Sequence, residues 1–169
     1  MMNWNIVLAD SARFSEWSYG RVMSVDDLYS TRIFGASRDL ACECGKYADD
    51  PARAGIICDV CGVTVAADSA TSRRTRLGHV ELAAPCRHPL GTKENLLFGF
   101  PVAPIAYRID GRGEPNPLGG KYEALVEANR VIRADLPEKG SEDHYRAIAE
   151  PHASLVVALR AVVGKRKDI

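Results

Sequence analysis

Hydrophobic and polar residues follow two rhythms along this chain, a strand-like one in its first two thirds and a helical one towards its end. Residues 79–83 alternate polar and apolar positions, while residues 3–9 and 96–109 contain short apolar runs. Runs of this length, and a period of two, are typical of β-strands. We therefore predict strands at 3–9 and 79–83, one or two strands within 96–109, and a loop over 84–95.

Helical spacing begins after residues 110–120, a segment rich in glycine and proline that we interpret as a linker. In the first predicted helix, side chains recur in steps of three or four residues, at Tyr122, Leu125, Val126, Asn129, Ile132 and Leu136. The second predicted helix carries Leu155, Leu159 and Val162 on one face. Two helices joined by a short connection predict an antiparallel helical hairpin over residues 121–169.

Two closely spaced cysteine pairs stand in the first half of the chain, Cys42 with Cys44 and Cys58 with Cys61. Four thiolates at such spacing suit a tetrahedral zinc ion with no open coordination position. A glycine follows each pair and tolerates the left-handed backbone of a tight knuckle. We predict a zinc ribbon over about residues 40–66 that holds one structural Zn²⁺ on these four sulfurs. The predicted fold class is therefore α+β, a zinc ribbon with short β-strands followed by a helical hairpin.

Other chemistry for these residues stays open. The pairs could form disulfides, although a C-x-C pair is an awkward geometry for one. They could also form a redox dithiol, although a second pair is not needed for that. We interpret Cys86 as a free, buried thiol and His79 as a structural hydrogen-bonding residue, with zinc ligation as the alternative for each.

Composition narrows the classes of function. The chain has 169 residues and a net charge of zero, so nucleic-acid binding would depend on a local patch. No run of about 18 apolar residues predicts a membrane span, and the amino terminus lacks the pattern of a secretory signal. We find no Gly-rich phosphate loop and no cluster of catalytic acids. We therefore expect a cytoplasmic protein without a small-molecule substrate and without catalysis of its own.

One local basic patch stands out. Residues 68–78 carry Arg73, Arg74 and Arg76 within four positions. These arginines could line a solvated loop, or they could contact phosphate groups of DNA or an acidic protein surface.

The middle of the chain resembles the amino-terminal region of the bacterial RNA polymerase β′ subunit. Two motifs that carry the resemblance surround the cysteines, C-x-C-G-K-Y from Cys42 and G-I-I-C-x2-C-G-V from Gly55. Residues 32–35 (R-I-F-G) precede them, and residues 74–85 (R-x-R-L-G-H-V-E-L-A-A-P) follow. Residues 15–20 (S-E-W-S-Y-G) upstream share the resemblance, and weaker similarity extends downstream to the proline-rich strand and the two helices.

The resemblance implies that the four cysteines are the zinc ligands of this family. It also implies a free-standing, truncated homologue in which residues 1–109 correspond to the start of the polymerase clamp. The hairpin then corresponds to the clamp coiled coil, where the family docks σ factors, with Asn129, Arg130 and Arg133 on the σ-binding face. The family's catalytic Asp motif is absent from this chain, so the chain would be at most part of a polymerase assembly.

Two departures from the family matter for function. Between the cysteine pairs, residues 48–53 contain two acids and one base where the family carries a basic loop near DNA. On the first helix, only Asn129 is kept of the Asn/Arg-rich face. Three functions therefore stay open: a non-catalytic module that binds a σ factor, polymerase or DNA, a clamp component of a split polymerase, and a zinc module with an unrelated role.

Overall fold

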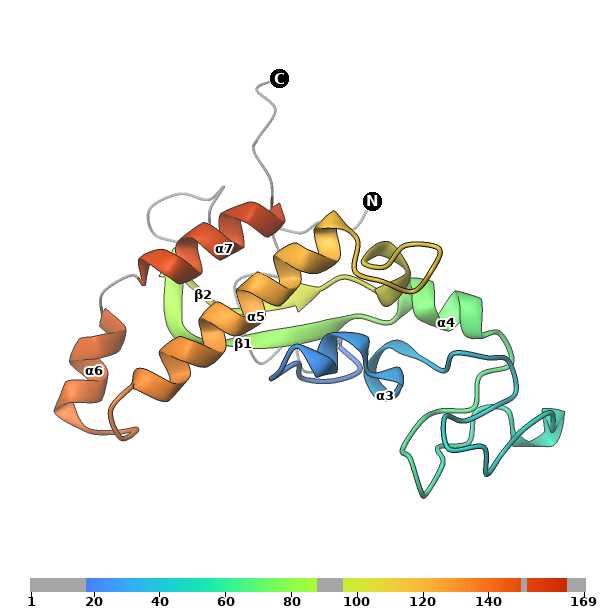
Figure 1. Ribbon diagram of the computed structural model, residues 1–169. Coiled ribbons are helices and arrows are strands. Elements are labelled where there is room, and N and C mark those ends of the chain that lie inside the picture. Colours follow the sequence, from blue (N-terminus) through green and yellow to red (C-terminus); the bar gives the residue numbers. More distant parts are fainter. Residues whose placement is uncertain (1–17, 88–95, 150–151, 164–169) are drawn as a thin grey trace.

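The computed structural model describes residues 18–87, 96–149 and 152–163 (Figure 1). The strand predicted at 3–9 lies outside these residues. The elements follow in the order η1 (Asp26–Tyr29), α3 (Thr31–Phe34), η2 (Pro51–Arg53), α4 (Ser69–Thr75), β1 (Gly78–Arg87), β2 (Leu96–Val102), η3 (Ile105–Tyr107), α5 (Pro117–Asp135), α6 (Glu142–Ala149) and α7 (Ala153–Val163). The α+β prediction is confirmed. No helix of the described segments has the length and apolar character that crossing a bilayer requires.

The sheet consists of β1 and β2, which pair antiparallel with Val80 opposite Phe100 and Glu81 opposite Gly99. The register is irregular between Glu81 and Cys86. The predicted strands at 79–83 and within 96–109 are thus confirmed, but the loop predicted over 84–95 is wrong at its start. β1 continues to Arg87 because the buried Cys86 lies opposite Leu97 and adds to the core.

Three short helical elements, α4, η1 and α3, lie where the sequence predicts no helix. The arginine-bearing segment 68–78 contains α4, whose amino terminus is capped by the Asp68 carboxylate accepting from the Thr71 N–H at 2.9 Å. This capping bond satisfies one of the otherwise unpaired N–H groups of the first turn. Likewise η1 and α3 occupy a stretch whose sequence shows little periodicity. All three were missed because elements of seven residues or fewer are too short for a period to show.

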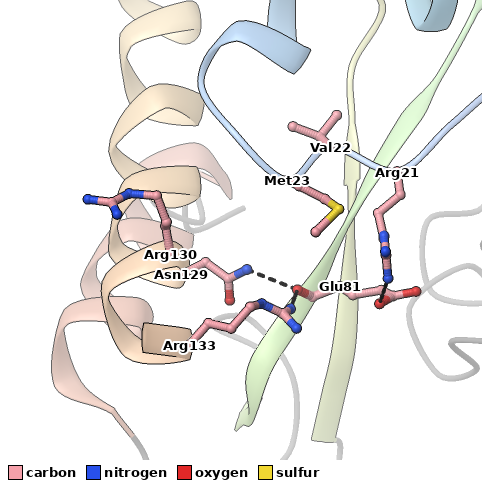
Figure 2. A pocket seen from close by; sticks show the side chains of 7 residues that line it. All are labelled: Arg21, Val22, Met23, Glu81, Asn129, Arg130 and Arg133. Carbon is pink, nitrogen blue, oxygen red and sulfur yellow. Dashed lines mark hydrogen bonds and ion pairs between the residues drawn. The ribbon is translucent and has the colours of Figure 1, made fainter. Parts of the chain in front are cut away.

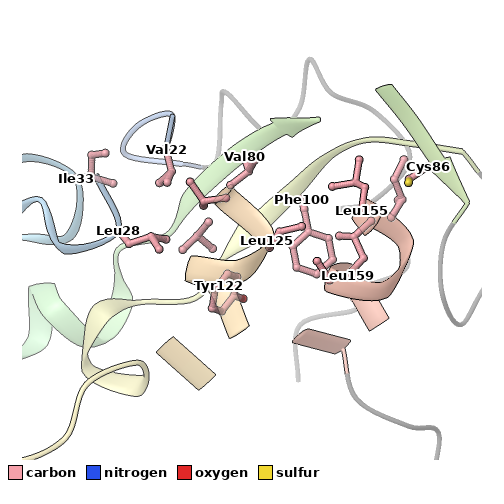
Figure 3. Close-up of a cluster of buried hydrophobic side chains, with 14 of the residues drawn as sticks. Val22, Leu28, Ile33, Val80, Cys86, Phe100, Tyr122, Leu125, Leu155 and Leu159 are labelled. Atoms are coloured by element: carbon pink, nitrogen blue, oxygen red, sulfur yellow. The ribbon is translucent and has the colours of Figure 1, made fainter. Parts of the chain in front are cut away.

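One hydrophobic cluster joins the two halves of the chain (Figure 3). It takes Val22, Leu28, Ile33 and Phe34 from the first segment, Val80, Cys86, Leu97, Phe100 and Val102 from the sheet, and Tyr122, Leu125, Val126, Ile132, Leu155 and Leu159 from the helices. The division of the chain at a 110–120 linker stays a prediction. The cluster, however, draws on both sides of that segment, and α5 begins within it at Pro117.

The two long carboxy-terminal helices lie against the sheet. In Figure 1, α5 and α7 lie side by side and run in opposite directions, and both contact β1 as well as each other. α6 stands between them in the chain and also contacts β1. In the described part of the chain these helices therefore fold back onto the strands, and they do not project as a separate arm.

Two polar side chains of α5 close the outer edges of the sheet. The Asn129 amide donates to the Glu81 carbonyl at 2.9 Å and accepts from the Ala83 N–H at 2.7 Å. The Tyr122 hydroxyl donates to the Pro101 carbonyl at 3.3 Å and accepts from the Ala103 N–H at 3.2 Å. A two-stranded sheet leaves such edge groups unpaired, so α5 provides hydrogen bonds as well as apolar burial.

Arg108 follows η3 directly, and its side chain is fully buried. Its guanidinium donates to the Ala103 and Leu28 carbonyls, each at 2.7 Å, and lies 4.4 Å from the ring centre of Phe34. Burial lowers the pKa of Arg108 to about 10. Gly119 in the first turn of α5 is close to the Arg108 carbonyl, since an added Cβ would come within 2.3 Å of that oxygen. Only glycine permits α5 to begin so near this turn.

The apolar face of α5 generates a first prediction. We expect Leu125→Ala, at a fully buried position, to lower the free energy of unfolding by about 2–5 kcal/mol, because it removes buried methyl groups and leaves a cavity. Urea denaturation followed by circular dichroism measures this change. Val131→Ala on the same helix is the control, since Val131 is 45% exposed and its truncation should change stability by well under 1 kcal/mol. Equal losses of unfolding free energy in the two variants would contradict the placement of Leu125 in the hydrophobic core.

The hydrogen bonds between Asn129 and the edge of β1 generate a second prediction. Asn129→Ala leaves the Ala83 N–H without its acceptor, and we expect unfolding to become easier by about 1–3 kcal/mol. Hydrogen–deuterium exchange should show faster exchange of the Ala83 amide, with little change in the Lys121→Ala control at an exposed position of α5. Unchanged protection of the Ala83 amide in Asn129→Ala would rule out this role for Asn129.

Candidate metal centre

Two tight turns bring the cysteine pairs into position. Gly45 and Gly62 adopt positive φ angles of 78° and 71°, the left-handed conformation expected after each pair. The Gly45 N–H donates to the Cys42 carbonyl at 3.3 Å, and the Gly62 N–H donates to the Cys58 carbonyl at 2.8 Å. Each turn thus folds its chain around a pair of sulfur atoms.

A small framework supports these turns. Cys42 bonds through its N–H to the Tyr47 carbonyl, and Cys58 bonds to the Val63 carbonyl, both at 2.9 Å. Beneath them lies a second hydrophobic cluster, formed by Ala36, Cys42, Cys58, Val63 and Val65. Regular strand structure in this region is limited to one isolated antiparallel bridge between Ile57 and Thr64. Since the cluster is small, hydrogen bonds and the sulfur centre must supply much of the order.

The four sulfurs gather at one point. All four Sγ atoms lie within 4.8 Å of one another, with Cys42 to Cys44 at 3.6 Å and Cys44 to Cys58 at 3.7 Å. A tetrahedron with Zn–S bonds of about 2.3 Å has edges of about 3.8 Å. The sulfurs therefore fit a tetrahedral metal ion, and all four cysteines are free thiols without a disulfide.

The thiols on their own differ in acidity. Burial raises the pKa of Cys61, but N–H groups of Val63 and Cys44 donate to its sulfur and lower that pKa to about 6. The Tyr47 N–H, 3.3 Å from the Cys42 sulfur, lowers the pKa of Cys42. For Cys44, donation from the Lys46 N–H is outweighed by burial and by the neighbouring sulfurs, and its pKa rises to about 12. Without a cation these shifts oppose one another, so they do not favour deprotonation of all four thiols. A cation at the centre would favour four thiolates.

The surroundings of the centre are acidic. Residues 40–66 contain four carboxylates and two basic side chains, a net charge of −2 before any thiolate is counted. Lys46 bonds both oxygens of Asp59, at 2.8 and 2.7 Å, and lies over the Tyr47 ring. The side chains of residues 40–66 therefore give this segment a net negative charge.

The structure separates the three arginines of the predicted basic patch. Arg73 and Arg74 lie on the last turn of α4. Arg76 is 9% exposed, and its guanidinium lies 4.4 Å from the ring centre of Tyr19. Any contact with phosphate at this surface would therefore rest on Arg73 and Arg74.

The predicted σ-binding residues also occupy different environments (Figure 2). Asn129 is buried, and its amide bonds β1. Arg130 is exposed and forms two hydrogen bonds with Glu127, and Arg133 donates to the Glu81 carbonyl at 2.9 Å. Only the two arginines are on the surface, so σ binding by this helix face stays a prediction that depends on them.

Sequence reasoning missed some contributors to these sites. Tyr47 holds the Cys42 sulfur with its N–H, and Arg21 pairs with Glu81 at 2.7 Å across 60 residues. His79, expected as a structural residue, bonds the Ser18 hydroxyl through its ring. The contacts of Arg21 and His79 join segments about 60 residues apart, and no local sequence pattern indicates them, whereas the Tyr47 contact lies within the turn of the first cysteine pair.

Comparison with known proteins agrees with the resemblance to the β′ subunit. The chain is 44% identical over 95 residues to the DNA-directed RNA polymerase subunits β′ of Lactobacillus gasseri and Oenococcus oeni, and 42% identical to that of Leuconostoc mesenteroides. Each match covers 49% of this chain and 8% of the relative, so the chain spans a small part of the curated relatives. No family model matches the chain. The four-cysteine cluster fits the zinc-binding region implied by the resemblance. Over about half of its length, this chain is thus a homologue of the β′ subunit of DNA-directed RNA polymerase.

Proposed function

We propose that the chain is a non-catalytic, zinc-binding module that acts in transcription by associating with RNA polymerase subunits. The observation that supports this proposal most strongly is that the chain has a four-sulfur centre and is also 42–44% identical to β′ subunits over 95 residues. Zinc is the metal best suited to four thiolates in a tetrahedron. Because all four positions are filled by protein sulfur, the ion serves structure and activates no water.

The role of the ion is to order the ribbon. The cluster beneath the knuckles contains only five buried residues, too few to fold that segment alone. Binding of zinc to four thiolates contributes roughly 10 kcal/mol or more of folding free energy in small metal-dependent domains. The ribbon then presents its acidic surface in one fixed shape.

Charge favours a protein partner for the ribbon. A structural Zn²⁺ on four thiolates adds a net −2 to the −2 of the ribbon side chains. DNA would be repelled by this surface, so contact with DNA would be left to Arg73 and Arg74 on α4. Binding of a σ factor to this helix face would depend on Arg130 and Arg133, because the Asn129 amide already bonds the backbone of β1.

A second candidate is a zinc module that has lost its link to transcription. The acidic segment between the cysteine pairs favours it, because the resemblance implies a basic loop there. A third, a clamp component of a split polymerase, differs from the main proposal only in stoichiometry. Both give distinct outcomes in the binding experiment below.

The metal proposal predicts one zinc per chain. We expect Cys61→Ser to lose most of the bound zinc and to broaden the amide signals of Val63 and Val65, while signals of α5 and β1 persist. Metal analysis and two-dimensional NMR measure the two effects. Cys86→Ser is the control, since Cys86 is buried in the main cluster away from the four sulfurs, and its zinc content should be unchanged. Full zinc content in Cys61→Ser would overturn the ligand assignment.

Affinity purification tests the partner. We expect the tagged chain, isolated from cells that contain it naturally, to bring polymerase subunits identified by mass spectrometry. A fixed one-to-one ratio with large subunits would indicate a clamp component, and a σ factor without the core enzyme would indicate a competing regulator. Failure of purified polymerase and σ factor to bind at micromolar concentration would count against a role in transcription and favour the unrelated zinc module.

A further inference from the structure

We propose that Cys44 is an oxidation site, at which a peroxide forms a sulfenic acid that then closes a disulfide with Cys58 and dismantles the metal centre. Two observations support this assignment. Cys44 is the exposed member of the four-sulfur centre, and its sulfur lies 3.7 Å from that of Cys58. The inference rests on the metal-binding part of the proposed function and is independent of the partner.

The four cysteines differ in their access to solvent. Cys42 and Cys58 are 2% and 1% exposed, and Cys61 is half-buried, whereas Cys44 is exposed. Oxidation of cysteine follows thiolate character and exposure. A bound metal ion requires all four ligands to be thiolates, so exposure is the property that distinguishes them. A peroxide therefore reaches Cys44 first.

Hydrogen bonds to the sulfurs separate the two most accessible cysteines further. The Cys61 sulfur accepts from the N–H groups of Val63 and Cys44. The Cys44 sulfur accepts from one backbone N–H, that of Lys46. Each donor stabilises negative charge on a sulfur and makes that sulfur less nucleophilic. Cys44 is thus both more exposed and less restrained by hydrogen bonds than Cys61.

The chemistry balances with one molecule of peroxide. The Cys44 thiolate attacks one peroxide oxygen, the O–O bond breaks, and hydroxide leaves, which produces a sulfenic acid. The Cys58 thiolate then attacks the Cys44 sulfur, so an S–S bond forms and the S–O bond breaks with loss of a second hydroxide. Each thiolate has lost one electron, and the two hydroxide ions take up two protons from solvent to become water.

Two sulfurs lie close enough to resolve a sulfenic acid on Cys44. Cys42 is 3.6 Å away and Cys58 is 3.7 Å away. A bridge to Cys42 would span a single residue, inside a turn that the Gly45 N–H closes on the Cys42 carbonyl. Cys58 lies on the other turn, 14 residues away in the chain, so a small approach of two separate segments brings the sulfurs together. The geometry therefore favours Cys58.

This bridge would affect the ribbon and spare the main core. It removes two of the four ligands that a structural zinc ion needs, and the cluster beneath the knuckles contains only five buried residues. In the main core, Cys86 is fully buried, and burial raises the pKa of its thiol. Oxidation would thus disorder residues 40–66 while the sheet and helices persist, and a thiol reductant with zinc would reverse the change.

Mass spectrometry of the zinc-loaded full chain tests the site. Hydrogen peroxide is added together with dimedone, a reagent that traps sulfenic acids, and we expect the early label on Cys44. Without the trap we expect a Cys44–Cys58 bridge and release of about one zinc ion per bridge, measured with a coloured chelator. Early label on another cysteine, or a first bridge that lacks Cys44 or joins it to Cys42, would overturn the assignment.

A matched pair of variants tests the same site by kinetics. Cys44→His and Cys61→His each keep four zinc ligands, because imidazole replaces one sulfur. We expect Cys44→His to slow zinc release by peroxide about tenfold or more, since the exposed thiolate is gone, and Cys61→His to release zinc nearly as fast as the unchanged chain. Equal rates in the two variants would contradict the inference. If either variant binds no zinc, the labelling of the unchanged chain decides.

Failure of this inference and failure of the proposed function give different results. A chain that binds no zinc before peroxide is added would refute the metal assignment. A zinc-loaded chain that keeps its zinc and its thiols, in peroxide that oxidises free cysteine, would refute the oxidation site alone. The partner is tested separately by affinity purification.

Discussion

The fold depends on the attachment of α5 to both edges of a two-stranded sheet. Two strands alone are marginal in water, because each exposes unpaired N–H and carbonyl groups along one edge. Asn129 satisfies Glu81 and Ala83 on β1, while Tyr122 satisfies Pro101 and Ala103 on β2. The apolar side chains between them, led by Leu125, bury the sheet face against α7. α5 thus supplies edge hydrogen bonds and hydrophobic contact, and residues 20–22 add two hydrogen bonds to His79 on β1.

The ribbon, residues 40–66, is stabilised in a different way from the sheet and helices. It has one isolated β-bridge and a five-residue cluster, so neither strand pairing nor hydrophobic burial can hold it. Order comes from two glycine-assisted turns that bring four sulfurs to tetrahedral spacing. The chain therefore combines a hydrophobic core that does not involve the four sulfurs with a segment that the proposed zinc ion would order. This division explains why ligand loss should affect one part of the chain and core truncation the other.

Charge is distributed unevenly over a chain whose net charge is zero. The ribbon is acidic, the end of α4 carries Arg73 and Arg74, and a small cavity between the 21–23 segment and α5 is lined by Arg21, Arg130 and Arg133. A zinc centre on four thiolates would make the contrast larger. Such separation lets one small protein contact a basic and an acidic partner surface at the same time.

The sequence by itself determined the gathering of the four cysteines, the α+β class, the strand that begins near His79 and the helix that carries Tyr122 to Ile132. These features are local: thiol spacing and turn glycines act over a few residues, and periodicity shows over one element. Tertiary structure alone decided that Asn129 seals a strand edge, that Arg76 covers Tyr19, and that Arg21 meets Glu81 in a groove with Arg133. Each of these contacts joins residues about 50 or more positions apart. Their geometry depends on how whole elements pack, which no local pattern encodes.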